Sequence, residues 1–325
     1  MDYVPLGRSG LKVSRVALGA FAFGDPAWQP WMLPEEQSRP IIRRAIEAGI
    51  NLLDTADMYS NGVSEEILGR AWPDFARREE LVLSTKAFGV TGSSINERGL
   101  SRKHLFDAVD LSLRRLRTDY VDIYQMHRID HTTPIEESLE AMHDIVKTGK
   151  ARYFGVSNLP AWYLMRILAI CDRRGWTRPI VIQNHFNLAY REEEREMVPL
   201  CVQEGIGMTP WSPLARGFLT RSSVKDGEAS LRSANDPYIK AYFGEAHDRA
   251  VVDAVQACAQ RHNRSMSEIA LAWLLTKPML AAPVIGATKL THVDGAVAAV
   301  SIKLNAEDIA ALEAPYKPHR VLLHI

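Results

Sequence analysis

The sequence predicts a (β/α)8 barrel formed by residues 1–325 as one domain, with a short N-terminal β-hairpin and long loops at the carboxyl face. Eight short apolar runs alternate with helical segments, and strict alternation implies parallel strands with right-handed crossovers. Eight such units over about 250 residues or more favour a closed barrel. The alternative is an open doubly wound sheet, but no Gly-x-Gly-x-x-Gly turn follows an expected strand.

The expected elements begin with a small hairpin at residues 1–13. Val4 and Leu6 would face Leu11 and Val13 across a turn at 8–10, and this hairpin could close the bottom of the barrel. The barrel strands are expected at eight apolar runs: Val16–Leu18, Leu52–Asp54, Leu81–Thr85, Val121–Gln125, Tyr153–Val156, Ile180–Gln183, Gly207–Thr209 and Ala282–Ile285.

The helices between these strands carry start and stop signals. Several amphipathic stretches end in a glycine that suits the left-handed position after a helix: Gly49, Gly149, Gly175 and Gly205. At the helix expected over 135–148, Thr133 can cap, Pro134 suits the first turn and Glu136 completes a capping box. The stretch Arg216–Asp248 is long and irregular, and such loops in compact domains are usually functional or mobile.

Composition and charge exclude several classes of protein. Lys+Arg and Asp+Glu both number 39, so the chain has no bulk attraction to nucleic acid or anionic membranes. No run approaches the ~18 apolar residues of a membrane helix, and the N-terminus lacks an apolar targeting core. The three cysteines have no paired spacing, which is typical of a reducing compartment. We expect a soluble cytoplasmic protein, monomeric or homo-oligomeric, without nucleic-acid or membrane partners.

Four residues that follow predicted strands indicate the chemistry: Asp54, Tyr59, Lys86 and His127. The carboxyl ends of parallel barrel strands share one face, so these side chains should converge on one pocket. The Lys86 ammonium should lower the pKa of the Tyr59 phenol, while Asp54 keeps Lys86 charged. Tyr59 would protonate a carbonyl oxygen as a hydride arrives, and Lys86 and His127 would stabilise its charge. None of these residues supplies a hydride, so a nicotinamide is required.

The chain resembles the aldo-keto reductase family over essentially its whole length. The similar segments are Gly49–Gly69, Leu83–Lys86, Asp119–Arg128, Gly155–Asn158, Trp211–Thr220 and Val284–Lys289. Within the family, the resemblance is strongest to the bacterial YajO-type branch, including the segments Tyr190–Met197 and Ala270–Pro278. It implies NADPH-dependent reduction of an aldehyde or ketone substrate to an alcohol, with Tyr59 as general acid.

The resemblance also implies which residues hold NADP(H). The carboxamide would be bound by Ser157, Asn158 and Gln183. Trp211 would stack on the nicotinamide where most of the family has Tyr, and Arg216 and Lys289 would bind the 2′-phosphate. The other expected cofactor residues are Gly19, Ala20, Phe21, Asp54, Ser212, Pro213, Leu214, Gly217, Ile285, Gly286, Thr288 and His292.

Three residues depart from the family pattern. His292 stands where Arg or Gln is frequent, and Ala296 stands where an adenine-binding Asn is common. Ser60 replaces a frequent Gly after Tyr59, and we expect this to be harmless because Gly62 supplies a nearby turn.

The expected substrate-binding residues are aromatic or catalytic: Phe23, Trp28, Trp31, Tyr59, Phe88 and His127. No metal site is expected, because the segment 132–134 argues against a helix that would carry both His127 and His131. Two alternatives remain open. One is a nicotinamide-sensing regulatory subunit with little turnover, and the other is a barrel isomerase or aldolase that uses Lys86 as a Schiff base.

Overall fold

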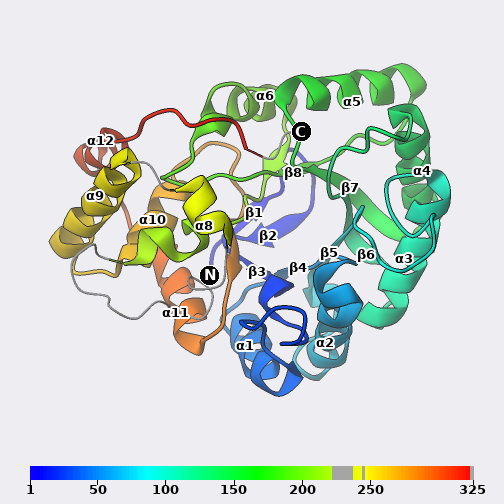
Figure 1. The fold of residues 1–325 in the computed structure, drawn as a ribbon, viewed down its shortest axis with the longest axis horizontal. Helices are drawn as coiled ribbons and strands as arrows, with labels where there is room; N and C mark the ends of the chain where they lie inside the picture. Colours follow the sequence, from blue (N-terminus) through cyan, green and yellow to red (C-terminus); the bar gives the residue numbers. More distant parts are fainter. Residues whose placement is uncertain (222–236, 244–245, 323–325) are drawn as a thin grey trace.

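The computed structural model describes residues 1–221, 237–243 and 246–322, and its centre is an eight-stranded parallel sheet (Figure 1). Each strand overlaps the apolar run at which it is expected. In spatial order the strands are β10 (Val284–Gly286), β3 (Ala17–Gly19), β4 (Leu52–Asp54), β5 (Val82–Ala87), β6 (Val121–Met126), β7 (Ala151–Ser157), β8 (Val181–Gln183) and β9 (Gly207–Met208).

The two ends of this sheet are joined to each other. Parallel bridges pair Met208 with Leu280 and Trp211 with Val284. The backbone N–H of Val284 also donates a hydrogen bond to the carbonyl of Pro210 at 2.9 Å. These contacts connect the β9 segment to the segment that leads into β10, as an eight-stranded barrel requires.

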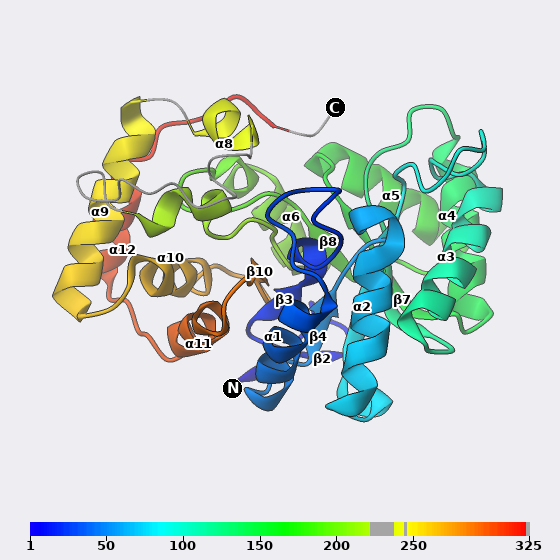
Figure 2. The ribbon, with the colours of Figure 1, turned by 60° about the horizontal axis from the view of Figure 1, so that its bottom comes forward.

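Helices surround the strands, as Figures 1 and 2 show. Their apolar faces point inward; in α4, for example, Leu139, Met142 and Ile145 are buried at the helical spacing. The helices are α1 (Glu35–Glu47), α2 (Val63–Ala71), α3 (Arg102–Leu116), α4 (Ile135–Lys147), α5 (Ala161–Arg174), α6 (Met197–Glu204), α8 (Pro237–Tyr242), α9 (Ala246–His262), α10 (Met266–Leu274), α11 (Leu290–Ala299) and α12 (Ala306–Glu313).

The N-terminal hairpin closes the amino-terminal end of the barrel. Its strands, β1 (Tyr3–Pro5) and β2 (Lys12–Ser14), pair antiparallel. Leu6 and Val13 are fully buried among the first residues of the barrel strands. A Cβ atom at Gly7 would lie 2.4 Å from the carbonyl oxygen of Gly205, so only glycine allows this approach. The prediction of a hairpin at the bottom of the barrel is confirmed.

Two local expectations are wrong. Thr133 does not cap α4, because Pro134 occupies the N-cap position and Thr133 lies one residue before it. The Thr133 hydroxyl instead donates a hydrogen bond to Asp130 at 2.8 Å. The expectation of an irregular stretch over Arg216–Asp248 is wrong for its last part, which forms helix α8 and the start of α9. Residues 222–236 and 244–245 of that stretch lie outside the described residues.

Candidate active site

A buried ion pair lies at the carboxyl ends of β4 and β5. Lys86 Nζ donates hydrogen bonds to Asp54 Oδ2 at 2.6 Å and to the Thr55 carbonyl at 2.7 Å. The Lys86 side chain is 0% exposed and that of Asp54 is 4% exposed. The other carboxylate oxygen, Oδ1, accepts hydrogen bonds from three side chains: Ser84, Gln125 and Gln183. Both charges are therefore held in fixed positions without water.

Tyr59 lies beside this ion pair, with Lys86 Nζ 5.3 Å from the centre of its ring. Burial alone would lower the pKa of Lys86, but the charges of Asp54 and Tyr59 raise it above its usual value. Burial raises the pKa of Tyr59 above its usual value, while the charge of Lys86 acts in the opposite direction. The expectation of a lowered Tyr59 pKa is therefore wrong for the net shift, because loss of water around the phenolate outweighs the attraction of Lys86.

His127 follows β6 and completes the group of four. Its ring centre lies 5.8 Å from that of Tyr59 in an edge-to-face arrangement. Burial, then the charges of Lys86 and Arg128, lower the pKa of His127 well below its usual value, so the imidazole is neutral at neutral pH. A neutral imidazole can donate one hydrogen bond from a ring nitrogen while the other nitrogen carries no proton.

A left-handed turn fixes the backbone that follows Tyr59. Ser60, Asn61 and Gly62 have φ values of 49°, 53° and 93°. Ser60 therefore adopts a left-handed backbone even though Gly62 lies nearby. This contradicts the expectation that Ser60 in place of glycine is harmless. The Ser60 hydroxyl accepts a hydrogen bond from the Asp25 backbone N–H at 2.9 Å, which offsets part of the strain.

The polar residues expected at the carboxamide of a nicotinamide bind one another. Ser157 Oγ donates to the carbonyl of Gln183 at 2.7 Å, and Asn158 Nδ2 donates to Ser157 Oγ at 2.8 Å. Asn158 Nδ2 also donates to the His127 carbonyl at 3.1 Å, and Asn158 has a φ of 55°. The Asn158 side chain thus links the end of β7 to the backbone of His127.

Trp211 follows β9 and is held on its edge and on one face. Its indole N–H donates a hydrogen bond to Asn158 Oδ1 at 2.9 Å. The His185 ring stacks on it at 4.3 Å with an angle of 12° between the rings. Tyr190 stacks on His185 in turn, at 4.6 Å and 13°. The indole therefore ends a rigid stack of aromatic rings.

The loop after Trp211 has several residues with left-handed backbone. Ser212, Ala215, Arg216 and Gly217 have φ values of 50°, 49°, 58° and 94°. Turns of this kind point successive backbone N–H groups toward one side and form concave sites for anions. Leu214 and Arg216 are half-buried, whereas Pro213 is buried.

The segment after β10 lies at the surface. Gly286, Lys289 and His292 are exposed, Thr288 is half-buried, and Ile285 is buried. The Thr288 N–H donates to His292 Nδ1 at 3.2 Å. Ala296, which stands where the family pattern has Asn, is buried in α11.

The family model for the aldo/keto reductase family matches residues 15–317. The chain belongs to the aldo/keto reductase family. It is 42% identical to the versiconal hemiacetal acetate reductase of Aspergillus parasiticus, over 99% of this chain and 98% of that protein. It is 40% identical to a Schizosaccharomyces pombe protein named as an aryl-alcohol dehydrogenase, over 97% of this chain and 96% of that one.

These relatives correct one expectation about this aldo/keto reductase. A third relative, an aldo-keto reductase of Metarhizium robertsii, is 38% identical over 100% of this chain and 93% of that protein. All three are fungal proteins, and they give no support to the expected bacterial YajO-type branch.

A cluster of aromatic side chains lies on one side of Tyr59 in this reductase. Phe21, expected near the cofactor, has its ring centre 4.9 Å from that of Tyr59, 5.2 Å from that of Trp31 and 6.1 Å from that of Trp28. By contrast, Phe23 is 0% exposed in the core, which argues against its expected contact with substrate.

Three further residues, one expected at the substrate and two at the cofactor, differ in their surroundings. Phe88 is half-buried against the core. Ala20 is buried. Gly19 packs between strands, because a Cβ atom there would lie 2.8 Å from the Val284 side chain.

Sequence reasoning missed several residues of the site. Ser84 and Gln125 bind Asp54 from inside otherwise apolar strands, and a polar residue at an inward strand position was a usable signal. Nothing in the sequence indicated His185, because its role depends on stacking with Trp211, which follows a different strand.

Among the residues that the structure describes, no helix is long and apolar enough to cross a membrane.

Proposed function

We propose that this aldo/keto reductase uses NADPH to reduce aldehydes and ketones to alcohols, with Tyr59 as the general acid. The observation that carries the proposal is the buried Lys86–Asp54 pair beside Tyr59, with a neutral His127 across the phenol ring. A charged ammonium, a phenol and an imidazole suit a carbonyl oxygen that gains negative charge.

The residues at the mouth of the barrel fit a nicotinamide dinucleotide. Trp211 offers an indole whose other face is covered by His185, and the left-handed loop at 212–217 suits a pyrophosphate. Lys289 and Arg216 supply cations for a 2′-phosphate. When bound, the cofactor supplies the hydride that the chain itself lacks.

The side chains would then act in a defined order. His127 donates a hydrogen bond to the carbonyl oxygen and orients it toward Tyr59. Tyr59 gives its proton to that oxygen as negative charge develops. The fixed charge of Lys86, held by Asp54, stabilises the phenolate that remains until solvent returns the proton.

The buried ion pair with Asp54 argues against Lys86 as a Schiff-base nucleophile. An amine attacks a carbonyl only when it is deprotonated, and the raised pKa keeps Lys86 protonated. No observation favours the regulatory-subunit alternative. Negligible turnover of every carbonyl, with intact NADPH binding, would support that alternative and contradict the proposed reductase.

We further propose aromatic carbonyl compounds as the preferred substrates. The Phe21 ring lies against Tyr59, and the rings of Trp28 and Trp31 lie against Phe21. Aromatic surfaces of this kind bind flat apolar molecules well. The Schizosaccharomyces pombe relative is named as an aryl-alcohol dehydrogenase, which supports this choice.

The test is a panel of aryl aldehydes, aryl ketones, small aliphatic aldehydes and sugar phosphates, assayed by the loss of NADPH and then NADH absorbance. We expect the highest kcat/KM for aryl aldehydes with NADPH. Equal kcat/KM for aryl and small aliphatic aldehydes would contradict the aromatic preference alone, whereas no turnover would contradict the reductase.

A further inference from the structure

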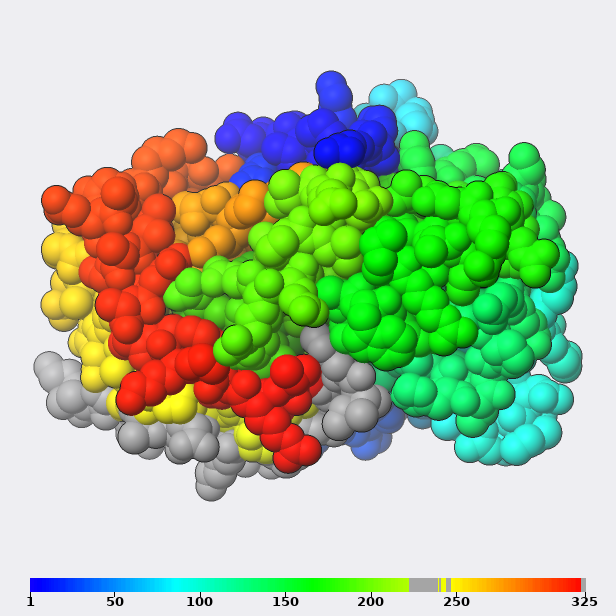
Figure 3. Space-filling model, turned by 90° about the horizontal axis from the view of Figure 1, so that it is seen from above, coloured from blue at the N-terminus to red at the C-terminus, as the bar shows by residue number. Residues whose placement is uncertain are grey.

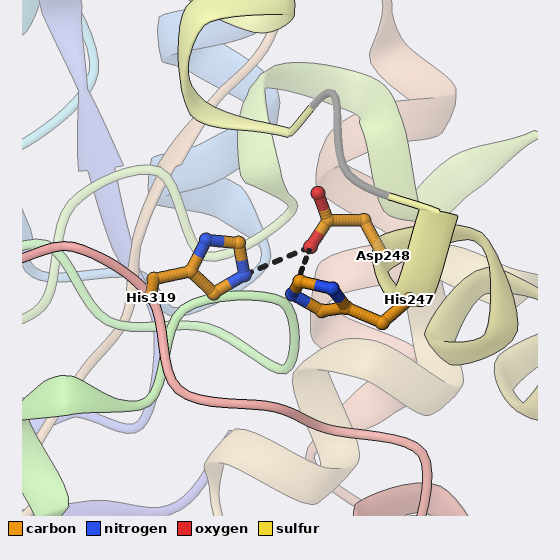
Figure 4. A group of neighbouring side chains, drawn as sticks. All are labelled: His247, Asp248 and His319. Atoms are coloured by element: carbon orange, nitrogen blue, oxygen red, sulfur yellow. Dashed lines mark ion pairs between the residues drawn. The ribbon is translucent and has the colours of Figure 1, made fainter.

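His247, Asp248 and His319 form a separate cluster where the C-terminal segment meets α9 (Figure 4). His247 and Asp248 belong to the first turn of α9, and His319 follows α12. Asp248 Oδ1 lies 2.8 Å from His319 Nε2 and 3.7 Å from His247 Nε2. The side chains of Asp248 and His319 are 1% and 7% exposed, so the cluster is mostly shielded from water.

The geometry of the two imidazoles is unusual for a hydrogen-bonded cluster. Nε2 of His247 and Nε2 of His319 are buried, and neither forms a hydrogen bond within the described part of the chain. The short distance from His319 to Asp248 therefore lacks the alignment of donor and acceptor. Two ligands of one ion approach each other in this way, because each directs its lone pair toward the ion rather than toward the other.

We propose that His247 Nε2, His319 Nε2 and Asp248 Oδ1 form a site for a divalent transition-metal ion, most suitably Zn²⁺, with a fourth position for water. Imidazole nitrogen and carboxylate oxygen are ordinary zinc ligands. Ligands around a tetrahedral zinc ion are about 3.3–3.5 Å apart, given bond lengths of about 2.0–2.2 Å. The distances of 2.8 and 3.7 Å bracket this spacing, so small side-chain movements would complete the site.

The proposal departs from the expectation of no metal, which rejected His127 and His131 as a pair and took the other eight histidines as surface or structural residues. His247 and His319 lie far apart in the sequence, so no short spacing motif reveals them. A site built from two distant segments becomes visible only when the fold brings them together.

A similar cluster elsewhere in the chain does not qualify. Cys258, His262 and Asp308 also lie close together, but the guanidinium of Arg261 donates a hydrogen bond to Asp308 Oδ1 at 2.9 Å. Asp308 also closes a capping box with Asn305 at the start of α12. Arg261 and the capping box use the Asp308 carboxylate, and the group of Cys258, His262 and Asp308 therefore serves as the control.

The proposed ion would join the C-terminal segment to α9 beside the aromatic stack. Figure 3 shows the C-terminal segment, in red, against residues near 190 and against α9. Tyr316 donates to Glu192 at 2.6 Å, and the Leu322 N–H donates to the Tyr190 hydroxyl at 2.9 Å. An ion that binds only the folded chain stabilises it in proportion to the logarithm of its concentration.

The experiment uses the full chain after treatment with a chelator, titrated with Zn²⁺ alone and with Co²⁺ alone. We expect one equivalent of Zn²⁺ to bind in the micromolar range or tighter and to raise Tm. Bound Co²⁺ should give the visible absorption of a site with four ligands. His319→Gln should weaken Zn²⁺ binding at least about tenfold, whereas the control His262→Gln should leave it unchanged.

The Tm of each metal-free variant reports whether it folds. If His319→Gln fails to fold, the more exposed His247→Gln replaces it, since that side chain is 20% exposed. Absence of stoichiometric Zn²⁺ binding by the wild-type chain would overturn the proposal. Equal Zn²⁺ affinity of the wild type and the folded His variant would overturn it as well. Neither readout depends on NADPH or on turnover, so the test is separate from the proposed reductase.

Discussion

Lys86 Nζ donates a 2.6 Å hydrogen bond to Asp54 Oδ2, and neither side chain is more than 4% exposed. An ion pair so deeply buried is stable only while both partners are present, because each would otherwise be a charge without water. Three side-chain donors around the second Asp54 oxygen fix the carboxylate further: Ser84, Gln125 and Gln183. The pair therefore serves both folding and the candidate chemistry.

Asp54→Asn should lower the free energy of unfolding by about 3–5 kcal/mol, because it leaves Lys86 buried without its counter-charge. The double variant Asp54→Asn/Lys86→Met should recover part of that loss. Asp107→Asn is a suitable control, since the exposed Asp107–Lys103 pair should contribute only about 0–1 kcal/mol. Urea unfolding followed by circular dichroism measures all three, and similar losses for Asp54→Asn and Asp107→Asn would contradict the argument.

Tyr59→Phe should retain NADPH affinity and lose turnover by about 10²–10⁴-fold, because in the proposed reaction the carbonyl oxygen receives its proton from the phenol. Steady-state NADPH oxidation gives the turnover, and fluorescence titration gives the affinity. Tyr3→Phe removes an exposed hydroxyl that bonds to the Gly49 carbonyl and serves as a control. Unchanged turnover in Tyr59→Phe would rule out Tyr59 as the acid.

Trp211→Leu should weaken NADPH binding by roughly 3- to 10-fold, because an aliphatic side chain cannot replace a stacked indole. Trp211→Phe should retain most of the affinity. Trp162→Leu, at a tryptophan that is 62% exposed on α5, is the control. Isothermal titration with NADPH measures each, and equal affinities of Trp211→Leu and the control would show that the indole does not contact the cofactor.

Ser60→Gly should be more stable than Ser60→Ala by about 1 kcal/mol, since both lose the hydrogen bond from Asp25 but only glycine removes the left-handed strain. Urea midpoints of the two variants give the difference directly. Equal stabilities would mean that the turn after Tyr59 carries no strain at this position.

The stability of the protein should fall as the pH is lowered below about 6.5, in part because of His127. The unfolded imidazole binds a proton near that pH, whereas the lowered pKa keeps the folded imidazole neutral until a much lower pH. Protons therefore favour the unfolded chain over this range. His127→Gln should reduce the difference between unfolding free energies measured at about pH 7.5 and 5.5. The exposed His131→Gln serves as the control, and an unchanged difference in His127→Gln would contradict the argument.

Much of the barrel could be predicted because its signals are local. Each strand is a short apolar run, and Asp54 and Lys86 lie at strand ends where a parallel barrel collects polar groups. The convergence of these residues followed from topology alone. The family resemblance then supplied roles that the residues by themselves leave open.

The features that the sequence could not predict depend on contacts between residues that only the fold brings together. The helix expected after Thr133 has its N-cap one residue later, at Pro134, and the Thr133 hydroxyl binds the Asp130 carboxylate in the loop. The Tyr59 pKa depends on the balance between lost water and the charge of Lys86, and only the structure shows that burial has the larger effect. The stacking of His185 on Trp211 likewise joins residues from different strands.

Leu6 and Val13 fill the amino-terminal end of the barrel with buried side chains. A cofactor and a substrate that react at Tyr59 would therefore both approach from the carboxyl ends of the strands. In that arrangement, whichever of the two molecules lies deeper would bind first and leave last.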